Sequence, residues 1–218
     1  MGKFNDAYVG KRNDILKHIP KEINFILDIG CSIGTLGKQI KNKNKCHVTG
    51  IELSKEMGEE ASKYLDKVII GDVEKSILEN IENDKYECII LADIIEHLKD
   101  PWKLIKDCNR ILKKDGIIIA SIPNIKHLST IYSLIIKGYW PYRDRGIHDK
   151  THLRFFTLKN IKELFKYPQF TKKNIDRNYR IIESPNKINK FAKIFSFFPL
   201  RNFFVFQYIV VYKKKKSY

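Results

Sequence analysis

Apolar, largely β-branched runs recur through the first half of the chain and are separated by more polar stretches. The run from Phe25 to Ile29 is apolar on both faces, which is typical of a buried parallel strand. Four later runs have a similar length, from Cys46 to Ile51, Lys67 to Ile70, Tyr86 to Ala92 and Ile117 to Ile122. The pattern predicts five strands of one sheet.

The polar stretches between these runs have helical spacing. Ser54 and Asp100 are capping residues, and Pro101 suits the first position of a helix. Helices are predicted at about 34 to 42, after Ser54, near 75 to 82 and from Asp100 to Leu112, and a basic helix at 10 to 19 precedes the first strand. This alternation predicts an α/β fold, a Rossmann-like doubly wound parallel sheet with its ligands at the carboxyl ends of the strands.

The pattern changes after Pro123. An amphipathic helix is predicted at 126 to 140, a loop rich in His and Arg at 141 to 154, and a helix at about 158 to 166. Further predictions are a strand from Phe170 to Ile175, a helix near 187 to 198 and a last strand from Phe203 to Tyr212. With no repeat or linker in view, we expect residues 1–218 to form a single domain, with a substrate-binding insertion at about 124–154.

Composition adds little to this picture. The chain has 218 residues, 43% of them hydrophobic, and a formal net charge of +16. Such a charge suits nucleic acid or an anionic surface, but the lysines are scattered, and we favour a general compositional bias. The four cysteines lack metal-binding spacing, and the N-terminus lacks an apolar signal region, so we expect free thiols and a cytoplasmic protein.

A glycine-bearing turn follows the first strand, in the stretch Asp28-Ile-Gly-Cys-Ser-Ile-Gly34. A nicotinamide-binding turn would place glycines at 30, 32 and 35, where this chain has Gly30, Ser32 and Thr35. Carboxylates end the next two strands, at Glu52 and Asp72. Glu52 is placed to accept hydrogen bonds from both hydroxyls of a ribose, and Asp72 to accept one from an adenine amino group. The three acidic residues lie at successive strand ends, which predicts a nucleoside-containing cofactor.

These segments resemble the successive motifs of class I S-adenosylmethionine (SAM)-dependent methyltransferases. The matching stretches are Ile26 to Gly34, Gly50 to Ser54, Gly71 to Val73 and Leu112 to Ala120, and Ala92 to Leu98 is similar to the small-molecule branch that includes the ubiquinone-type O-methyltransferases. The resemblance implies SAM as the cofactor and an antiparallel seventh strand. Ser32 departs from the usual glycine. The cofactor-binding residues that it implies are Tyr8, Arg12, Asp28, Gly30, Cys31, Gly34, Glu52, Leu53, Asp72, Val73 and Ala92.

The stretch from His148 to Thr157 resembles methyltransferases of cell-surface polysaccharide and glycolipid biosynthesis. It implies a sugar hydroxyl as the methyl acceptor. Histidine suits the general base for such an acceptor, and the candidates are His97, His148 and His152. For each of these histidines, a purely structural role is the alternative to a role as the base. Tyr142, Arg143 and Arg154 are the candidates for substrate binding. Asp93, Glu96 and His97 lie close together in sequence, but we expect no metal, because carboxylates beside a helix are usually caps or solvated.

Two rival functions remain open. The positive charge suits an RNA methyltransferase, although Ala92-Asp93-Ile94-Ile95 does not match the motif of amino-group base methylation. The stretch 191–216 is rich in Phe, Ile and Val and ends in lysines, which suits peripheral membrane contact and a quinone or lipid precursor as acceptor. Charged and polar residues interrupt that stretch, so a transmembrane span is not expected.

Overall fold

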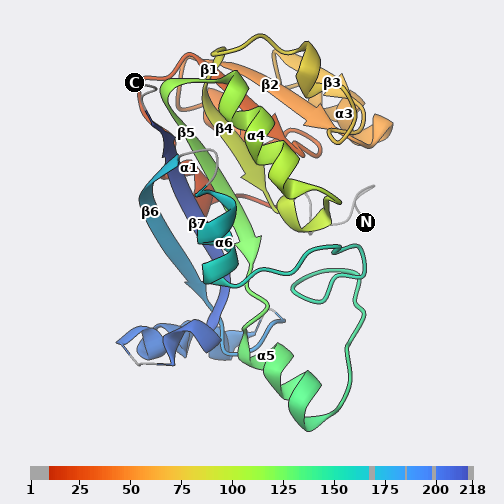
Figure 1. Cartoon of the computed structure of the whole chain (residues 1–218), viewed down its shortest axis with the longest axis vertical. Helices are drawn as coiled ribbons and strands as arrows, with labels where there is room; N and C mark the ends of the chain where they lie inside the picture. The colour runs from red at the N-terminus through yellow and green to blue at the C-terminus, as the bar shows by residue number, and fades with distance from the viewer. Residues whose placement is uncertain (1–9, 167–169, 185, 198–199, 216–218) are drawn as a thin grey trace.

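A single mixed sheet of seven strands forms the centre of the molecule (Figure 1). The structure is a computed structural model and describes residues 10–166, 170–184, 186–197 and 200–215. The strand order is β3-β2-β1-β4-β5-β7-β6, and β7 runs antiparallel to both of its neighbours. This confirms the predicted fold. The strands are β1 Phe25–Ile29, β2 His47–Glu52, β3 Lys67–Ile70, β4 Tyr86–Ala92, β5 Leu112–Pro123, β6 Phe170–Tyr179 and β7 Val205–Lys214.

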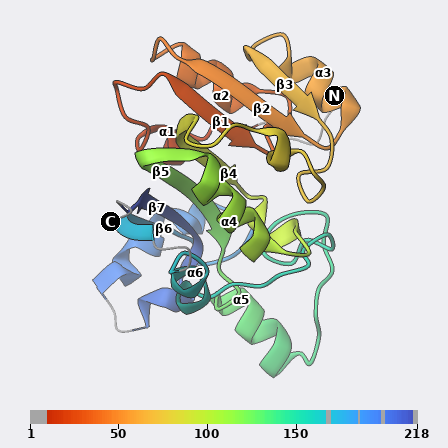
Figure 2. The same ribbon diagram turned by 45° about the horizontal axis from the view of Figure 1, so that its top comes forward.

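Helices cover both faces of the sheet (Figures 1 and 2). One face packs against Leu104, Ile105 and Ile161, and the other against Ile15 and Ile40. The α-helices are α1 Asn13–Leu16, α2 Thr35–Lys41, α3 Lys55–Ala61, α4 Pro101–Ile111, α5 Leu128–Ile131 and α6 Leu158–Leu164. The 3₁₀ helices are η1 Leu78–Asn80, η2 Ile95–His97, η4 Lys187–Phe197 and η5 Arg201–Phe203, and η3 Tyr132–Ile136 is a π-helix that continues α5.

The order of the strands reverses around β1, whose neighbours are β2 and β4. Ile29 at the end of β1 lies opposite both Ile51 of β2 and Leu91 of β4. The connections from β1 and β4 therefore leave toward opposite sides of the sheet and open a crevice at this carboxyl edge. The predicted cofactor residues follow these strands.

Several predicted elements differ in length from those observed. The helix predicted at 10 to 19 is only the single turn α1, because Arg12 has a non-helical backbone and the chain tightens at His18, whose N–H bonds to the carbonyl of Ile15. The helix predicted near 75 to 82 is reduced to η1. In contrast, β5 begins at Leu112 and runs for 12 residues.

The predicted last strand is observed as β7, and it accounts for part of the stretch 191–216 for which peripheral membrane contact is predicted. β7 lies between β5 and β6, and Ile209, Val210 and Val211 are buried in the sheet. This part of the segment belongs to the core, and the exposed large apolar residues described in the rest of it are Phe191, Ile194, Phe197 and Leu200. Across the described residues, we find no helix of the length and hydropathy that a bilayer-spanning segment needs.

The segment after β5 leaves the sheet and returns to it at α6. At its base, Asn124 and Phe156 form a β-bridge, and the N–H of Ile125 donates to the carbonyl of Phe156 at 3.0 Å. The Asn124 amide also donates to the carbonyls of Asn202 and Val205. Between these ends, α5 and η3 project from the lower end of the molecule (Figure 1).

Candidate active site

A cavity of about 600 Å³ occupies the crevice at the carboxyl ends of the first strands. It lies between the turn after β1, the end of β2 and the residues that follow β3 and β4. The predicted cofactor residues that line it are Arg12, Asp28, Gly30, Cys31, Glu52, Leu53, Asp72, Val73 and Ala92. Ser32, Thr35, Met57 and Thr151 also line the cavity and were not predicted.

The glycine turn after β1 requires its two glycines. Gly30 and Gly34 have φ values of 78° and 77°, in the region that favours glycine. A Cβ at Gly30 would lie 3.1 Å from the Ile94 side chain, and one at Gly34 would lie 3.0 Å from the Cα of Ala61. Gly34 does not line the cavity. Its place in the structure is in the turn and in the packing against α3.

Backbone donors hold the two carboxylates at the ends of β2 and β3. Glu52 accepts hydrogen bonds from the N–H of Ser32 and from the N–H of Ser54, both at 2.9 Å. Asp72 accepts one from the N–H of Glu74 at 2.9 Å. Each carboxylate is thus fixed in direction and retains lone pairs toward the cavity, as recognition of hydroxyl and amino groups requires.

Asp28 is the most deeply buried acidic group of the cavity. Its side chain is 1% exposed, and neither carboxylate oxygen has a hydrogen-bond partner. Burial raises the pKa of Asp28 to about 7; the charge of Arg12 opposes this effect and that of Glu52 adds to it. A buried carboxylate without partners is costly in an isolated protein and suits a cationic ligand.

A second cavity of about 660 Å³ lies beside the first. The two share Arg12, Asp93 and His97 in their linings. Arg12 donates to Asp93 at 2.5 Å and to Asp14 at 3.1 Å, so its guanidinium is held in the wall between the cavities. The other side chains of the second cavity are mostly polar and include Lys11, Arg143, Arg145, Asp149, His152, Asn178, Arg180, Glu183 and Gln207.

The three candidate histidines have different surroundings. His97 lines both cavities, and His152 lines the second; their rings meet edge to face with centroids 4.7 Å apart. His148 lines neither cavity and is 1% exposed. Its Nδ1 lies 2.8 Å from a carboxylate oxygen of Glu183, and its Nε2 lies 3.1 Å from the hydroxyl of Thr130. Both ring nitrogens of His148 are therefore engaged within the protein.

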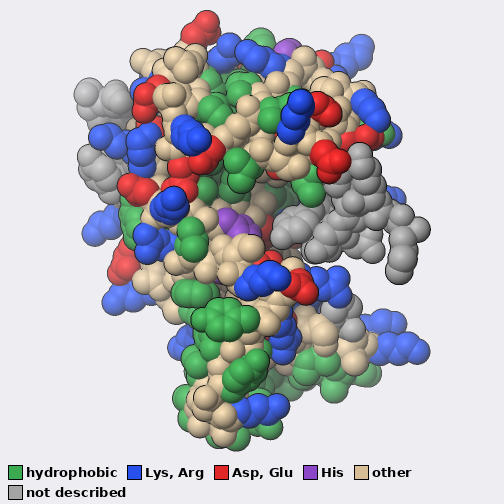
Figure 3. Space-filling model, turned by 90° about the vertical axis from the view of Figure 1, so that its right-hand side faces the viewer, with side chains coloured by type: hydrophobic (Ala, Val, Ile, Leu, Met, Phe, Trp, Pro, Cys, Tyr) green, Lys and Arg blue, Asp and Glu red, His purple; other side chains and the backbone are tan. Residues whose placement is uncertain are grey.

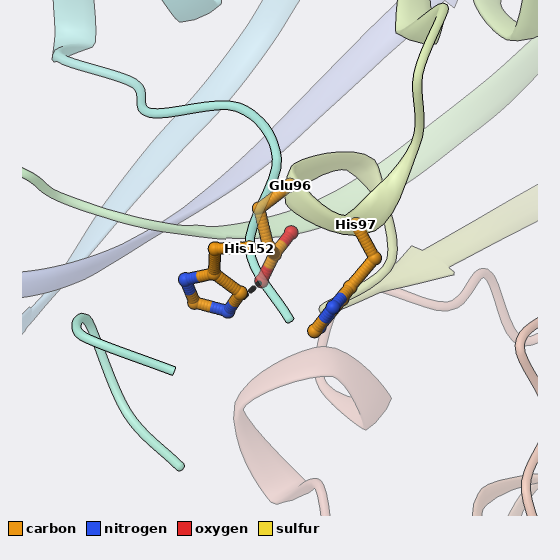
Figure 4. A group of neighbouring side chains, drawn as sticks. All are labelled: Glu96, His97 and His152. Atoms are coloured by element: carbon orange, nitrogen blue, oxygen red, sulfur yellow. Dashed lines mark ion pairs between the residues drawn. The ribbon is translucent and has the colours of Figure 1, made fainter. Parts of the chain in front are cut away.

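Glu96 lies next to His97 and His152 (Figure 4). It comes from η2, after β4, and is 2% exposed. One of its oxygens lies 4.0 Å from Nε2 of His152, and neither oxygen has a hydrogen-bond partner. Burial raises the pKa of Glu96 well above its ordinary value, and the nearby charge of Asp93 adds to this effect.

Of the three predicted substrate-binding residues, Arg143 lines a cavity, and Tyr142 and Arg154 do not. Arg143 lines the second cavity and forms an ion pair with Glu183 at 2.8 Å. Tyr142 is 75% exposed and lines neither cavity. Arg154 donates to the carbonyl of Lys99, and its guanidinium lies 5.8 Å from the centre of the Trp102 ring. Tyr8 lies outside the described residues.

Sequence reasoning missed the residues that β6 and the loop after it contribute. Arg180 and Glu183 follow β6 and face the second cavity, where Glu183 is 6% exposed. The polar character of the end of β6, Asp176-Arg-Asn-Tyr-Arg180, is the available signal for this side of the site. It is a weak signal, because a solvated edge strand is polar as well.

Comparisons with known proteins identify a family and relatives that match much of the chain. A family model described as a methyltransferase domain matches residues 7–172. A ubiquinone biosynthesis O-methyltransferase of Neisseria meningitidis is 23% identical over 130 residues, which cover 57% of this chain and 55% of that protein. An uncharacterized protein of Methanocaldococcus jannaschii is 27% identical over 184 residues, 84% of this chain and 80% of that protein. This chain thus spans about half the length of the Neisseria enzyme.

Solved structures show the same fold. A SAM-dependent methyltransferase from Archaeoglobus fulgidus superposes with a TM-score of 0.67 at 18% identity, covering 96% of this chain and 97% of that one. A Haloferax volcanii methyltransferase in complex with the Trm112 methyltransferase activator gives a TM-score of 0.69 at 15% identity, covering 98% and 92%.

Proposed function

Because this chain belongs to the methyltransferase-domain family and is a SAM-dependent methyltransferase, we propose that its acceptor is a small polar molecule that carries hydroxyl groups, with a sugar hydroxyl as the methylated group. The observation that supports this proposal is the second cavity, whose lining contains both hydrogen-bond donors and acceptors. This cavity shares Arg12, Asp93 and His97 with the lining of the first cavity. Sugars present both donors and acceptors, so such a lining suits them. The segment 124–154 supplies part of this acceptor site.

The cofactor fits the residues of the first cavity. Asp28 is a buried carboxylate without partners and suits the cationic part of SAM, while Glu52 and Asp72 suit its ribose and adenine. When bound, the cofactor supplies a methyl group already activated by a sulfonium centre. The protein therefore has to orient an acceptor oxygen in line with that methyl group and accept its proton.

We propose that His97 or His152 accepts the proton of the acceptor hydroxyl. His97 lies in the wall that both cavities share, and His152 is next to it. An alanine variant of the working base is expected to lose ~10²–10⁴-fold in turnover while its SAM affinity is unchanged. His148→Ala serves as the comparison, because its ring nitrogens are engaged by Glu183 and Thr130. A larger loss in His148→Ala than in both other variants would contradict this assignment.

Arg145 provides a test of the acceptor cavity. It lines the second cavity, and no ion pair within the described residues engages its guanidinium. Arg145→Gln is expected to raise the KM for an acceptor with an anionic group roughly 10-fold, the loss of a hydrogen bond to a charged group, with SAM affinity unchanged. Arg201→Gln on η5 is the matched control. An unchanged KM in Arg145→Gln would exclude this contact.

Labelled SAM and fractionated cell extract give the most direct test of the acceptor class. We expect the label to enter sugar-containing metabolites or glycans. Label in RNA, with binding that falls steeply as salt rises, would instead favour the RNA methyltransferase. Label in an extractable quinone or lipid precursor would favour the membrane-associated alternative.

An apolar and basic surface at the lower end of the molecule supports contact with a membrane (Figure 3). We call it the lower surface; its exposed apolar side chains are Leu134, Ile135, Ile136, Phe191, Ile194 and Phe197. The same regions carry basic residues: Lys137 directly follows η3, and Lys190 and Lys193 lie on η4. The sequence has no acidic residue from 124 to 143 or from 184 to 218. Such a surface suits the headgroups and outer acyl region of an anionic bilayer.

Vesicle co-sedimentation tests this contact. Wild-type protein is expected to bind vesicles that contain phosphatidylglycerol, and the Ile135→Glu/Ile136→Glu variant to bind them far less. Trp102→Glu, at an exposed apolar residue of α4, is the control. Equal binding by all three proteins would show that the lower surface is not the contact.

A further inference from the structure

Glu96 is a buried carboxylate that the protein itself does not neutralise. It is 2% exposed, and neither oxygen has a hydrogen-bond partner. The closest cationic candidate is the His152 imidazole, with Nε2 4.0 Å from a Glu96 oxygen, which is beyond hydrogen-bond distance. Protonation of Glu96 would remove the charge but leave a buried O–H group without an acceptor. A ligand with positive charge would neutralise the carboxylate.

The two histidines beside Glu96 are oriented by their other ring nitrogens. Nδ1 of His152 lies 3.1 Å from the carbonyl of Ile147. Nδ1 of His97 lies 3.0 Å from the hydroxyl of Thr151 and 3.3 Å from the Thr151 carbonyl. A carbonyl accepts a hydrogen bond, so each Nδ1 carries the proton and each Nε2 presents a lone pair. Metal-binding histidines are held in this way.

The three residues are grouped closely enough to share one cation. Each offers a ligand atom, and these atoms lie within 4.8 Å of one another (Figure 4). Two ligands at the ~2.0–2.2 Å typical of a nitrogen or oxygen on zinc lie about 3.4 Å apart at a tetrahedral angle and at most about 4.4 Å apart. Side-chain rotations that bring these atoms roughly 1 Å closer would complete the site. We infer that Glu96, His97 and His152 bind a single divalent transition-metal ion.

The ligand set indicates which ions suit the site. Two imidazoles and one carboxylate suit zinc, manganese, iron or cobalt better than calcium, which prefers oxygen ligands throughout. Three protein ligands also leave positions open for an exogenous oxygen. This inference departs from the sequence-based expectation of no metal, which nothing in the structure tests. The third ligand comes from the loop at 141–154, which the sequence does not place beside the segment after β4.

The position of the site gives the ion a role, and this step rests on the proposed function. His97 faces both cavities, so an acceptor oxygen that reaches the cofactor would pass next to the ion. An acceptor hydroxyl bound to a divalent cation loses its proton more readily. The proton passes to solvent, the oxygen forms a bond to the methyl group, the bond between sulfur and methyl breaks, and S-adenosylhomocysteine leaves as a neutral thioether. The histidines would then hold the ion rather than accept the proton.

Metal binding by the full chain, with neither SAM nor acceptor present, tests the inference. Protein treated with a chelator and then dialysed is titrated with Mn²⁺, Zn²⁺ and Co²⁺ by calorimetry. We expect one ion per chain, and for Co²⁺ a visible absorption spectrum typical of four or five ligands. Glu96→Gln and His152→Gln are each expected to weaken binding by more than the ~10–100-fold that the loss of an outer-shell partner costs.

Two controls make the result decisive. His47→Asn removes a histidine at the start of β2, far from the site, and is expected to leave the stoichiometry and affinity unchanged. Thermal unfolding identifies any variant that fails to fold, in which case pulsed electron paramagnetic resonance of the Mn²⁺-loaded wild type takes its place and is expected to show coupling to imidazole nitrogen. No binding, or equal binding by the wild type and both site variants, would overturn the metal site. Methyl transfer by the metal-free protein would leave the proposed function standing and refute only the role of the ion.

Discussion

Asp28→Asn provides a sharp test of the cofactor cavity, because its effect on stability has to depend on pH. Asp28 is fully buried without partners, and its pKa in the folded protein is about 7, against an ordinary value of 3.8. Between these values the folded chain holds a proton that the unfolded chain has released, so the stability of the wild type falls as pH rises through this window. The difference between the two pKa values corresponds to about 4 kcal/mol of folding stability, at ~1.4 kcal/mol per pH unit.

The asparagine variant has no titrating group at this position. Its own buried amide costs ~1–3 kcal/mol at every pH, since it also lacks partners. The free energy of unfolding of the variant, relative to the wild type, is therefore expected to rise by about 3 kcal/mol from pH 4.5 to pH 8. Urea unfolding at both pH values measures this difference, in which the other titrating groups cancel. A difference that is constant across the range would refute the reasoning.

The same charge links Asp28 to the cofactor. SAM is cationic and favours the ionised form of Asp28, so its binding is expected to release a proton near neutral pH. The affinity of the wild type for SAM should rise between pH 6 and pH 8. Calorimetry in two buffers with different heats of ionisation measures the released proton. The Asp28→Asn variant is expected to bind SAM weakly and to release none.

Three further variants test other parts of the site. Glu52→Gln is expected to lose ~1.5–3 kcal/mol of SAM binding, the cost of a charged hydrogen bond; calorimetry showing wild-type affinity would contradict the role of Glu52. Gly34→Ala, at a φ of 77° and with its Cβ 3.0 Å from Ala61, is expected to lower the stability by ~1–3 kcal/mol in urea unfolding. Glu183→Gln removes the charge that faces His148 and Arg143, and is expected to cost ~1–3 kcal/mol of stability, because the Arg143 side chain is half exposed and stays solvated. If Glu183 served only substrate binding, KM would change in that variant and the melting temperature would not.

The cofactor side of the molecule was predictable from sequence for a physical reason. Parallel strands end at one edge of a sheet, so Asp28, Glu52 and Asp72 had to come close together whatever the details of the loops. The local turn chemistry agrees with this arrangement, since Gly30 and Gly34 both have positive φ. The family resemblance named the ligand. Neither source of information depends on long-range loop geometry.

The acceptor side lacks such a regular pattern. Glu183 meets His148 because β6 pairs with β7 at the far edge of the sheet, and the loop at 141–154 folds back to that edge. His152 meets Glu96 by the same folding, across 56 residues of sequence. Polar residues of the loop at 141–154 line the second cavity, at Arg143, Arg145, Asp149 and His152. Their spacing contains no information on which side chain points inward. The sequence therefore could not distinguish His148, which is buried and bonded to Glu183 and Thr130, from His97 and His152, which line the cavities.

The wall between the cavities shows how the two sides become one site. Asp93 follows β4 with a φ of 54°, and its carboxylate accepts hydrogen bonds from Ser121 of β5, Gln207 of β7 and Arg12 of the N-terminal segment. A residue in this strained conformation persists only when its surroundings fix it. Because those partners come from three separate elements, the wall can form only when the sheet is complete. The two cavities are thus held at a set distance by the fold itself, as the alignment of acceptor and cofactor in the proposed methyl transfer requires.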